Sequence, residues 1–399
     1  MSLAVISLGR VYHNLRLSCV AVIWRWPLQV LCNKRMDKGK GELVKIGLST
    51  GGGDCPGLNS VIRAIVRYAS ATLGHEVIGI EDSFNGLLEK PYRIRPLELS
   101  DVSGILNRGG TILGARSSGN PFKTKPGQDP NSCPKSSKVI EAYRELGLDC
   151  MIVIGGDGSQ RIASHFIKLG LNIIGIPKTI DNDVLQADFT TGFETAVEVA
   201  SEAIIRLQST AESHDRIMVL EVMGRHAGHI ALHSGIASGA HAILLPEIPF
   251  DYAAVAQKIR DRRKLGHNYS VIVVAEGAFE KGHDKMYLTR PNGKKTLGGI
   301  GQSVADKLSE ITGSEARVTV LGHVQRGGEP CPRDRILGTL YGVKAVNMAL
   351  TKEFSKVVIM RGHKLQAVSY ESIASGYREL EVDDMYLEAA EAIGVCVGR

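Results

Sequence analysis

Short apolar runs alternate along this chain with glycine-rich turns and amphipathic segments, and this alternation limits the fold more than any other feature. Most runs are apolar on both faces, as strands are when helices cover both faces of their sheet. The segments between the runs repeat apolar residues at helical spacing. The pattern predicts an α/β fold with mainly parallel sheets and right-handed crossovers. The expected strands span residues 44–49, 150–154, 172–176, 217–222, 242–245, 270–275 and 317–321, and the expected helices span 58–70, 137–146, 159–169, 193–208, 252–264, 301–312 and 334–350.

The composition is that of an ordinary globular protein, with 43% hydrophobic and 23% charged residues among 399. These proportions exclude collagen-like, disordered and disulfide-stapled chains. No uninterrupted apolar stretch approaches the ~18 residues of a membrane span, so we expect no membrane association. The 7 cysteines are dispersed without a C-x-x-C pair, which favours free thiols in a reducing compartment, here the cytoplasm, and indicates no zinc site.

Residues 1–35 differ from the rest of the chain. They contain five Lys and Arg residues and no acidic residue, so they carry most of the net charge of +6. The remainder is nearly neutral, and we expect no nucleic-acid partner. Arg25 and Pro27 interrupt the apolar run of this segment, which makes it a poor signal-peptide core. We expect the fold to begin near Lys45 and treat residues 1–43 as a leader outside it, with a transit peptide in residues 1–35 as the less favoured alternative.

Three loops that follow expected strands contain the residues suited to chemistry, since ligands of such sheets bind at the carboxyl ends of the strands. The loop at 50–59, TGGGDCPGLN, has consecutive glycines that let backbone N–H groups approach an anion ahead of a helix. It matches neither a P-loop nor a G-x-G-x-x-G fingerprint, and a tight structural turn explains it equally well. The loop at 155–159, GGDGS, suits a nucleotide phosphate with Asp157 as a carboxylate for its metal, or a helix N-cap.

The third loop, PKTIDND at 177–183, holds two carboxylates, Asp181 and Asp183, beside Thr179 and Lys178. This set fits a general base that acts on an alcohol near a metal-bound phosphate. An Asp-rich turn is the plain alternative for this loop taken alone. Three such loops in one sheet make a purely structural explanation much weaker.

Arginines near strand ends form a second set, because they recognise phosphates through forked hydrogen bonds. Each one alone is more often a surface ion pair, and His323 and Glu276 also have structural alternatives. Acidic loops for a metal and a base, together with arginines for anions, indicate phosphoryl transfer to a phosphorylated polyol. The arginines concerned are Arg116, Arg216, Arg225, Arg317 and Arg326.

Seven longer motifs follow one another after residue 44: GGGDCPGLN (51–59), NRGGTILGAR (107–116), IGGDGS (154–159), PKTIDND (177–183), TGFETA (191–196), EVMGRHAGHIAL (221–232) and VLGHVQRGG (320–328). In these motifs the chain resembles the 6-phosphofructokinase family, of the phosphofructokinase A type, over nearly all of its length after residue 44. Lipid and NAD kinases share a loop like GGDGS, but the PKTIDND and MGRHAG motifs disfavour them.

The resemblance implies two Rossmann-like α/β lobes with the active site in the cleft between them. Residues 44–190 and 325–399 would form the ATP-binding lobe, and residues 191–324 the lobe that binds fructose 6-phosphate. The enzyme would be a homo-oligomer, a dimer or a tetramer. Arg216 and Arg317 would reach the sugar phosphate across a subunit interface.

The resemblance also implies a role for each matching residue. Asp181 would accept the proton of the sugar 1-hydroxyl, with Thr179, Asp183 and Arg225 beside it, and Asp157 would hold Mg²⁺. The donor would contact Gly53, Arg116, Ser117, Gly156, Asp157, Gly158 and Ser159. The sugar phosphate would contact Thr179, Ile180, Asp181, Arg216, Met223, Gly224, Arg225, Glu276, Arg317, His323, Val324, Gln325 and Arg326.

Gly158 and Lys178 mark the choice of phosphoryl donor. Pyrophosphate users of the family typically carry Asp and Lys at these positions, and ATP users typically carry Gly at both. Gly158 keeps space open and avoids charge repulsion with a nucleotide, whereas a lysine suits either donor. We therefore expect phosphorylation of fructose 6-phosphate by ATP, as in glycolysis. The alternatives are a pyrophosphate-dependent phosphofructokinase and a catalytically inactive sugar-phosphate sensor or regulatory subunit.

Overall fold

The computed structural model describes residues 43–116, 120–123, 133–289, 291, 293, 295–373, 375–381 and 383–399. The chain divides into two units, residues 1–42 and Leu43–Arg399, and all described residues belong to the second. The predictions for the leader, including the transit-peptide alternative, therefore fall outside the described residues. In the part that is described, no helix is long and apolar enough to cross a membrane.

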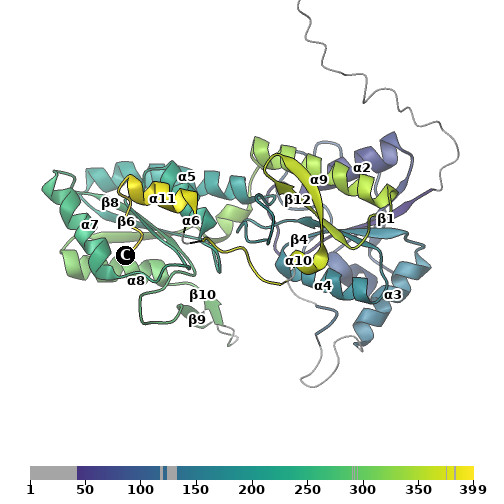
Figure 1. The fold of residues 1–399 in the computed structure, drawn as a ribbon, viewed down its shortest axis with the longest axis horizontal. Coiled ribbons are helices and arrows are strands. Elements are labelled where there is room, and N and C mark those ends of the chain that lie inside the picture. Colours follow the sequence, from purple (N-terminus) through teal and green to yellow (C-terminus); the bar gives the residue numbers. More distant parts are fainter. Residues whose placement is uncertain are drawn as a thin grey trace, which may run out of the picture. The chain divides into compact units, whose positions relative to one another are not determined.

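Seven strands form the larger sheet, in the order β13 (Lys364–Ser369), β12 (Lys356–Arg361), β5 (Ile173–Pro177), β4 (Cys150–Gly155), β1 (Lys45–Thr50), β2 (Glu76–Ile80) and β3 (Ile94–Pro96) (Figure 1). The inner strands run parallel to one another, while β3 and β13 pair antiparallel at the two edges. Every residue of β4 and β5 is buried, as expected for strands covered on both faces.

Helices cover both faces of this sheet, with α2 (Leu58–Val66) and α9 (Pro332–Leu350) on one face and α3 (Pro134–Glu145), α4 (Asp157–Lys168) and α10 (Tyr370–Ile373) on the other (Figure 1). Successive side chains of a strand point to opposite faces. In β4, Ile152 and Ile154 therefore join the apolar cluster of α2 and α9, whereas Met151 and Val153 join that of α3 and α4. The π-helical turn η1 (Arg67–Thr72) continues α2, and the short 3₁₀ helix η2 (Ser83–Leu87) follows β2.

Four parallel strands form the smaller sheet, in the order β11 (Ala316–Val320), β6 (Ile217–Val222), β8 (Ser270–Ala275) and β7 (Ala242–Leu244). Helices α5 (Phe193–Ser213) and α6 (His229–Ala237) share one apolar cluster with this sheet, and α7 (Tyr252–Lys264) and α8 (Ile300–Thr312) share another. A hairpin of β9 (Tyr287–Thr289) and β10 (Lys295–Leu297) precedes α8, and the 3₁₀ helix η4 (Gly322–Arg326) follows β11. The sheet thus repeats the covered arrangement of the larger one.

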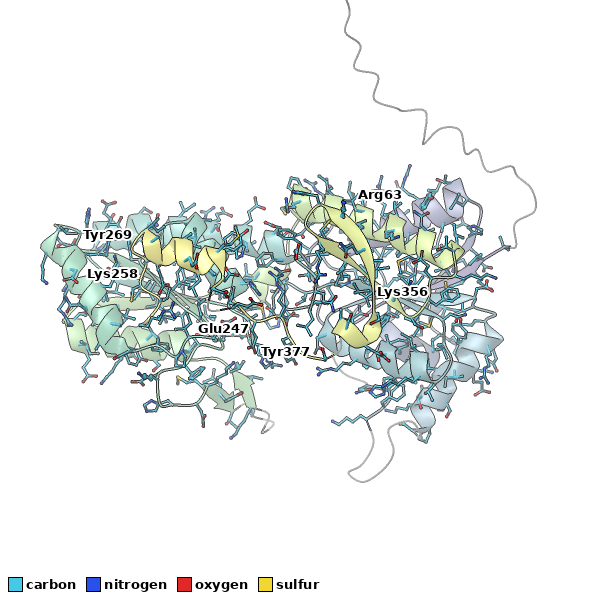
Figure 2. All side chains as sticks on the ribbon, viewed as in Figure 1. Arg63, Glu247, Lys258, Tyr269, Lys356 and Tyr377 are labelled. Atoms are coloured by element: carbon cyan, nitrogen blue, oxygen red, sulfur yellow. The ribbon has the colours of Figure 1, made fainter. Side chains whose placement is uncertain are left out.

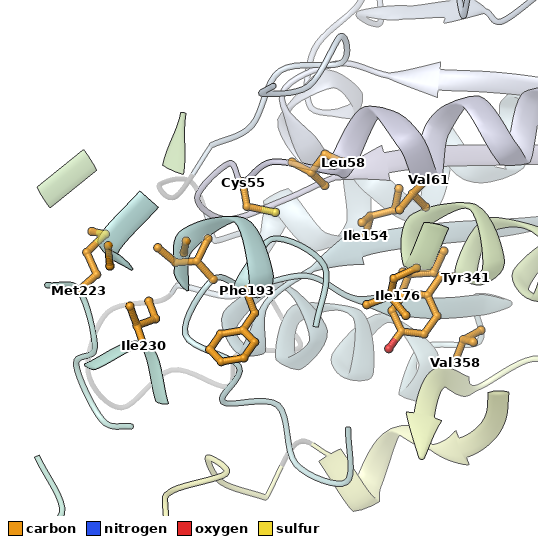
Figure 3. Close-up of a cluster of buried hydrophobic side chains, with 14 of the residues drawn as sticks. Cys55, Leu58, Val61, Ile154, Ile176, Phe193, Met223, Ile230, Tyr341 and Val358 are labelled. Atoms are coloured by element: carbon orange, nitrogen blue, oxygen red, sulfur yellow. The ribbon is translucent and has the colours of Figure 1, made fainter. Parts of the chain in front are cut away.

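One apolar cluster runs continuously from the larger sheet to the smaller one. It contains Ile154 and Ile176 of the larger sheet, Phe193 at the start of α5, and Ile230 of α6 (Figure 3). The two sheets therefore share part of a common core, which limits how far one can move without the other.

The structure confirms the predicted α/β class with mainly parallel sheets. All of the predicted strands are present with shifts of at most a residue or so at their ends, and the segments 217–222 and 270–275 match in full. The sequence pattern missed β2, β3, β9, β10, β12 and β13. Both edge strands, β3 and β13, are half exposed and lack a continuous apolar run, so period and composition gave no signal for them.

The end of the chain differs from the predicted division into lobes. Residues 325–399 were assigned with 44–190, and α9, β12 and β13 do lie with the larger sheet. However, α11 (Met385–Ala392) joins the apolar cluster of α6, and Cys396 forms a β-bridge with Ala242 of the smaller sheet. The chain therefore returns to the smaller sheet after α10, because Leu387, Ala390 and Val397 bury their apolar side chains there. The assignment of donor and sugar binding to these regions stays a prediction.

Candidate active site

The three sequence-predicted loops lie side by side at the carboxyl edge of the larger sheet. Strand register fixes this, since Thr50 pairs with Ile154 and Gly155 pairs with Pro177. Backbone hydrogen bonds join the loops themselves, from Gly51 N to Ile154 O at 2.9 Å and from Lys178 N to Gly155 O at 3.0 Å. Parallel pairing thus brings together segments more than a hundred residues apart in the chain.

A cavity of about 570 Å³ opens at this edge. Residues of all three loops line it, together with Arg326 from η4, which follows the smaller sheet. Its size suits a nucleotide-sized ligand. The predicted residues that line it are Gly53, Arg116, Gly156, Asp157, Gly158, Ser159, Lys178, Thr179, Ile180 and Arg326.

Glycines of the first two loops bring the backbone close to the start of α4. A Cβ atom on Gly51 would lie 2.6 Å from Ser159 Oγ, so only glycine fits beside this buried serine. Asp157 stands in the first turn of α4, where the N–H groups of the helix end have no helical partner. Such a helix start attracts the negative charge of a phosphate.

Gly158 faces open space. It is exposed, it lines the cavity, and a Cβ atom built on it meets no atom within 4 Å. A larger side chain at this position would therefore extend into the cavity without a steric clash in the empty site. Any discrimination by this residue acts on the ligand rather than on the fold.

Lys178 is buried, and its ammonium donates a hydrogen bond to the carbonyl oxygen of Gly53. Burial lowers the pKa of Lys178, and the charges of Asp54 and Asp181 act in the opposite direction. The lysine therefore connects the loop at 178–183 to the glycine loop at 51–57. It also lines the cavity.

Of the two carboxylates of PKTIDND, Asp183 is buried, and Asp181 is half-buried with one buried oxygen. Burial raises the pKa of Asp181 and that of Asp183, because a carboxylate loses solvation there. The charge of Asp181 adds to the rise at Asp183, whereas the guanidinium of Arg326 opposes the rise at Asp181. Oδ1 of Asp181 is buried without a hydrogen-bond partner among the described residues, although its neighbours Thr179 and Ile180 line the cavity. Asp181 is not among the residues that line the cavity, so this unpaired oxygen lies beside the site and not in its wall.

Residues at the carboxyl edge of the smaller sheet lie close to Asp181. Glu276 follows β8, and its charge raises the pKa of Asp181, while Arg225, which follows β6, lowers it. Burial also raises the pKa of Glu276, and Arg225 counters that rise. Met223 donates its N–H to Gln325 Oε1 at 2.8 Å, and its sulfur lies 3.5 Å from Nε of Arg326. The carboxyl edges of both sheets therefore contribute to one polar region around Asp181.

A family model for phosphofructokinase matches residues 45–349, most of the described chain. This chain belongs to the phosphofructokinase family. Relatives in the family include the ATP-dependent 6-phosphofructokinase 1 of Synechocystis sp., 44% identical over 360 residues that make up 90% of this chain and 99% of the relative. The ATP-dependent 6-phosphofructokinase of Chloroflexus aggregans is 48% identical over 357 residues, 89% of this chain and 98% of the relative.

Solved phosphofructokinase structures share the fold. The Pichia pastoris phosphofructokinase in the T-state matches with a TM-score of 0.74 and 32% identity over 84% of this chain, which spans 36% of that longer chain. The pyrophosphate-dependent phosphofructokinase of Marinobacter aquaeolei matches with a TM-score of 0.71 over 90% of this chain and 93% of its own. At 19% identity, the second likeness concerns the fold alone.

Some predicted residues of the phosphofructokinase motifs do not line the cavity. Gln325 is fully buried and uses its amide oxygen to hold Met223, while His323 and Val324 are exposed on η4. Gly224 accepts the N–H of Gly277 through its carbonyl. Ser117 lies outside the described residues, so its predicted donor contact stays a prediction.

Arg216 and Arg317 lie at the opposite edge of the smaller sheet. They stand at the amino ends of β6 and β11, away from Met223 and Glu276 at the carboxyl ends. Both pair with Glu315, with 2.5 Å between Arg216 Nε and the carboxylate. Their own chain therefore keeps them out of the cavity.

The sequence pattern missed several residues that line the cavity. Ser83 and Asn85 come from η2, which follows the strand β2 that periodicity did not reveal, and Arg161 and His165 come from the exposed side of α4. Arg161 forms an ion pair with Asp157. The sequence did contain a signal for Arg161. It lies four residues after Asp157, and side chains at positions i and i+4 of a helix lie next to each other.

Asp157 fits a magnesium site of the kind that kinases use. Nowhere in the described residues do three His, Cys, Asp or Glu side chains gather as metal ligands. Mg²⁺ commonly takes one or two protein carboxylates and completes its shell with water and substrate phosphates. A carboxylate that is 13% exposed, at a helix start and in the cavity wall, provides such a ligand.

Proposed function

We propose that this chain transfers the γ-phosphoryl group of ATP to the 1-hydroxyl of fructose 6-phosphate and releases fructose 1,6-bisphosphate. One observation carries the proposal: the anion-attracting start of α4 and the loop of Asp181 border the same cavity, which Arg326 closes from the smaller sheet. The relatives from Synechocystis sp. and Chloroflexus aggregans are named ATP-dependent 6-phosphofructokinases, which supports this reaction and this donor.

In the proposed mechanism the donor phosphates bind at the start of α4, where N–H groups and the helix dipole favour negative charge. Gly53, Arg116 and Gly158 border this region. Asp157 would hold Mg²⁺, which would supply positive charge to the donor phosphates when bound. Arg116 forms an ion pair with Asp82 at 3.3 Å and lines the cavity, so it is held in position for a phosphate.

Asp181 serves as the general base. Its Oδ1 is buried and has no partner among the described residues, and we assign it the proton of the 1-hydroxyl, which it accepts once the bound sugar reaches it and attacks in line. The raised pKa of Asp181 makes it a better proton acceptor than an exposed carboxylate. Arg326 and Arg225 place positive charge nearby, where it stabilises the negative charge on the transferring oxygens.

The sugar phosphate is proposed to bind along the carboxyl edge of the smaller sheet, at Met223, Gly224, Glu276 and His323. Arg216 and Arg317 point elsewhere in their own chain, where Glu315 holds them both. We assign them to the sugar phosphate of a second copy in a homodimer or homotetramer. Light scattering of the purified protein tests the oligomeric state. The cytoplasmic location stays a prediction.

A donor comparison tests the function. The purified chain is assayed with Mg²⁺ and fructose 6-phosphate, offered either ATP or pyrophosphate, and the bisphosphate is detected by coupling to aldolase. We expect turnover with ATP and little with pyrophosphate, and fructose without its phosphate serves as the control acceptor. A clear preference for pyrophosphate would overturn the donor assignment. Absence of turnover with both donors would favour the inactive-sensor alternative.

A further inference from the structure

The chain crosses from the larger sheet to the smaller one between α10 and α11, and this crossing segment passes beside the candidate site. Figure 1 shows it as the yellow chain that joins the two helices, and Figure 2 labels Tyr377 on it. Residues 375–381 are all described. Neither composition nor periodicity singled out this segment.

Tyr377 contacts His226, in the loop that follows β6, and Arg161 of α4. Its ring stacks on His226 with 4.4 Å between centroids and 13° between planes. Its hydroxyl lies 3.5 Å from Nη2 of Arg161, whose guanidinium also stands 6.0 Å from the ring centroid. Arg161 in turn forms the ion pair with Asp157.

The chain positions of these partners matter. His226 directly follows Arg225, which stands near Asp181, and Arg161 lies one helical turn after Asp157. Tyr377 therefore bridges the proposed metal carboxylate and the loop of the sugar site through two side chains. Burial raises the pKa of Asp157, and the nearby Arg161 and a hydrogen bond with Tyr377 both lower it, which agrees with this contact.

The backbone around Tyr377 is firmly anchored. Arg378 donates its N–H to the carbonyl oxygen of Asp183 at 2.9 Å, and its guanidinium donates to the carbonyls of Ala187 and Asp188 at 2.7 and 2.8 Å. His229 Nε2 lies 3.2 Å from the carbonyl oxygen of Arg378. The crossing segment is thus held to the PKTIDND loop on one side and to α6 on the other, which fixes the backbone next to Tyr377 between the two.

We propose that Tyr377 is a positioning residue that couples donor binding to sugar binding. The inference rests on the proposed function, because it assigns the two sides of the bridge to ATP and to fructose 6-phosphate. A donor that engages Asp157 changes the position of Arg161, its ion-pair partner. Tyr377 transmits this change to His226, and so to Arg225. Coupling between two ligands is reciprocal, so sugar binding also alters donor affinity.

Isothermal titration tests the coupling. The dissociation constant of fructose 6-phosphate is measured with Mg²⁺ alone and with Mg²⁺ plus the non-transferable ATP analogue AMP-PNP. The coupling ratio is the larger of the two constants divided by the smaller. We expect a ratio of at least about 5 in the unmodified protein, within the usual range for coupled sites. Tyr377→Ala should bring the ratio close to 1. Tyr377→Phe keeps the stacked ring and loses the hydroxyl, so it should retain part of the coupling.

A second tyrosine–histidine pair provides a matched control. The ring of Tyr386 of α11 lies beside that of His233 of α6 with the same 4.4 Å between ring centroids and a tilt of 43°, and neither residue lines the cavity. Tyr386→Ala should lower the melting temperature and leave the coupling ratio unchanged. If Tyr377→Ala does not fold, the coupling ratio measured in Tyr377→Phe still tests the role of Tyr377.

The outcomes separate the two proposals. Absence of fructose 6-phosphate phosphorylation by the unmodified protein refutes the proposed function. If phosphorylation is present, a ratio near 1 in the unmodified protein refutes the role of Tyr377. An unchanged ratio in both Tyr377 variants refutes it as well, and so does equal loss of coupling in Tyr386→Ala.

Discussion

Asp334 offers the most sharply defined test of how this fold is held together. It lies in the first turn of α9, is completely buried, and caps the start of another helix, α5. Its Oδ1 accepts the N–H of Gly192 at 2.8 Å, and its Oδ2 accepts both the N–H and the hydroxyl of Thr195 at 2.9 and 2.5 Å. Among the described residues of α5 itself, no side chain caps this end. The carboxylate therefore satisfies donors that would otherwise be buried without partners.

Asp334→Asn keeps the shape of the side chain and replaces one acceptor oxygen with a donor NH₂ group. In either orientation of the amide, the NH₂ group faces a backbone N–H, of Gly192 or of Thr195. The backbone N–H and the NH₂ group that face each other then both lack an acceptor, at about 1–3 kcal/mol each. Removal of a buried charge offsets part of this cost. We expect the free energy of unfolding to fall by about 2–4 kcal/mol.

Urea unfolding followed by circular dichroism measures this change. Asp384→Asn is the matched control, because Asp384 caps α11 at a partly exposed site, where Asn is as good a cap as Asp. The control should change the free energy of unfolding by less than about 0.5 kcal/mol. A loss below about 1 kcal/mol for Asp334→Asn, or one no larger than in the control, would show that the cap is not as important as its hydrogen bonds indicate.

Four further predictions concern the candidate site. Asp181→Asn should lower kcat by about 10²–10⁴ with the dissociation constant of fructose 6-phosphate largely retained, and a loss below about tenfold in a steady-state assay would exclude the assigned base. Burial raises the pKa of Asp181 to about 6, and a base acts in its ionised form, so kcat should fall as the pH drops through this region. Removing the opposing charge by Arg326→Gln should move this acid limb of the pH profile to higher pH, and a shift to lower pH would contradict the assignment. Gly158→Asp places a carboxylate in open space within the cavity. Because this carboxylate repels the donor phosphates, kcat/KM for ATP should fall by roughly 100-fold. A steady-state donor assay measures this loss, with Gly158→Ala as the uncharged control.

Most inner strands and helices could be predicted from the local pattern of apolar and polar residues. Strand β8 is apolar from Val271 to Ala275, β6 is apolar apart from Glu221, and α7 starts at the predicted residue, because each of these signals lies within one short segment. The pattern did not reveal β3 and β13, whose residues are partly exposed and are strands because a neighbouring strand supplies their hydrogen bonds. Pairing of this kind depends on distant residues and leaves little trace in local composition.

The candidate site shows the same division. The glycines and acids of the three loops were recognisable because strand-end loops of a parallel sheet converge at one edge. Three other features were not recognisable from the sequence. They are the burial of Gln325 against Met223, the pairing of Arg216 and Arg317 with Glu315, and the unpaired oxygen of Asp181. Each of these depends on which side chains the folded chain brings into contact, and no spacing in the sequence encodes that.

The α/β class, the three loops of the site and the family motifs follow from the sequence alone, since these depend on residues close together in the chain. The position of Tyr377 between Arg161 and His226 and the capping of α5 by Asp334 are known only from the folded chain. Both residues act over more than a hundred positions in the chain. Their partners are set by the packing of the two sheets around a shared core, where contact depends on position in space and not on order in the chain.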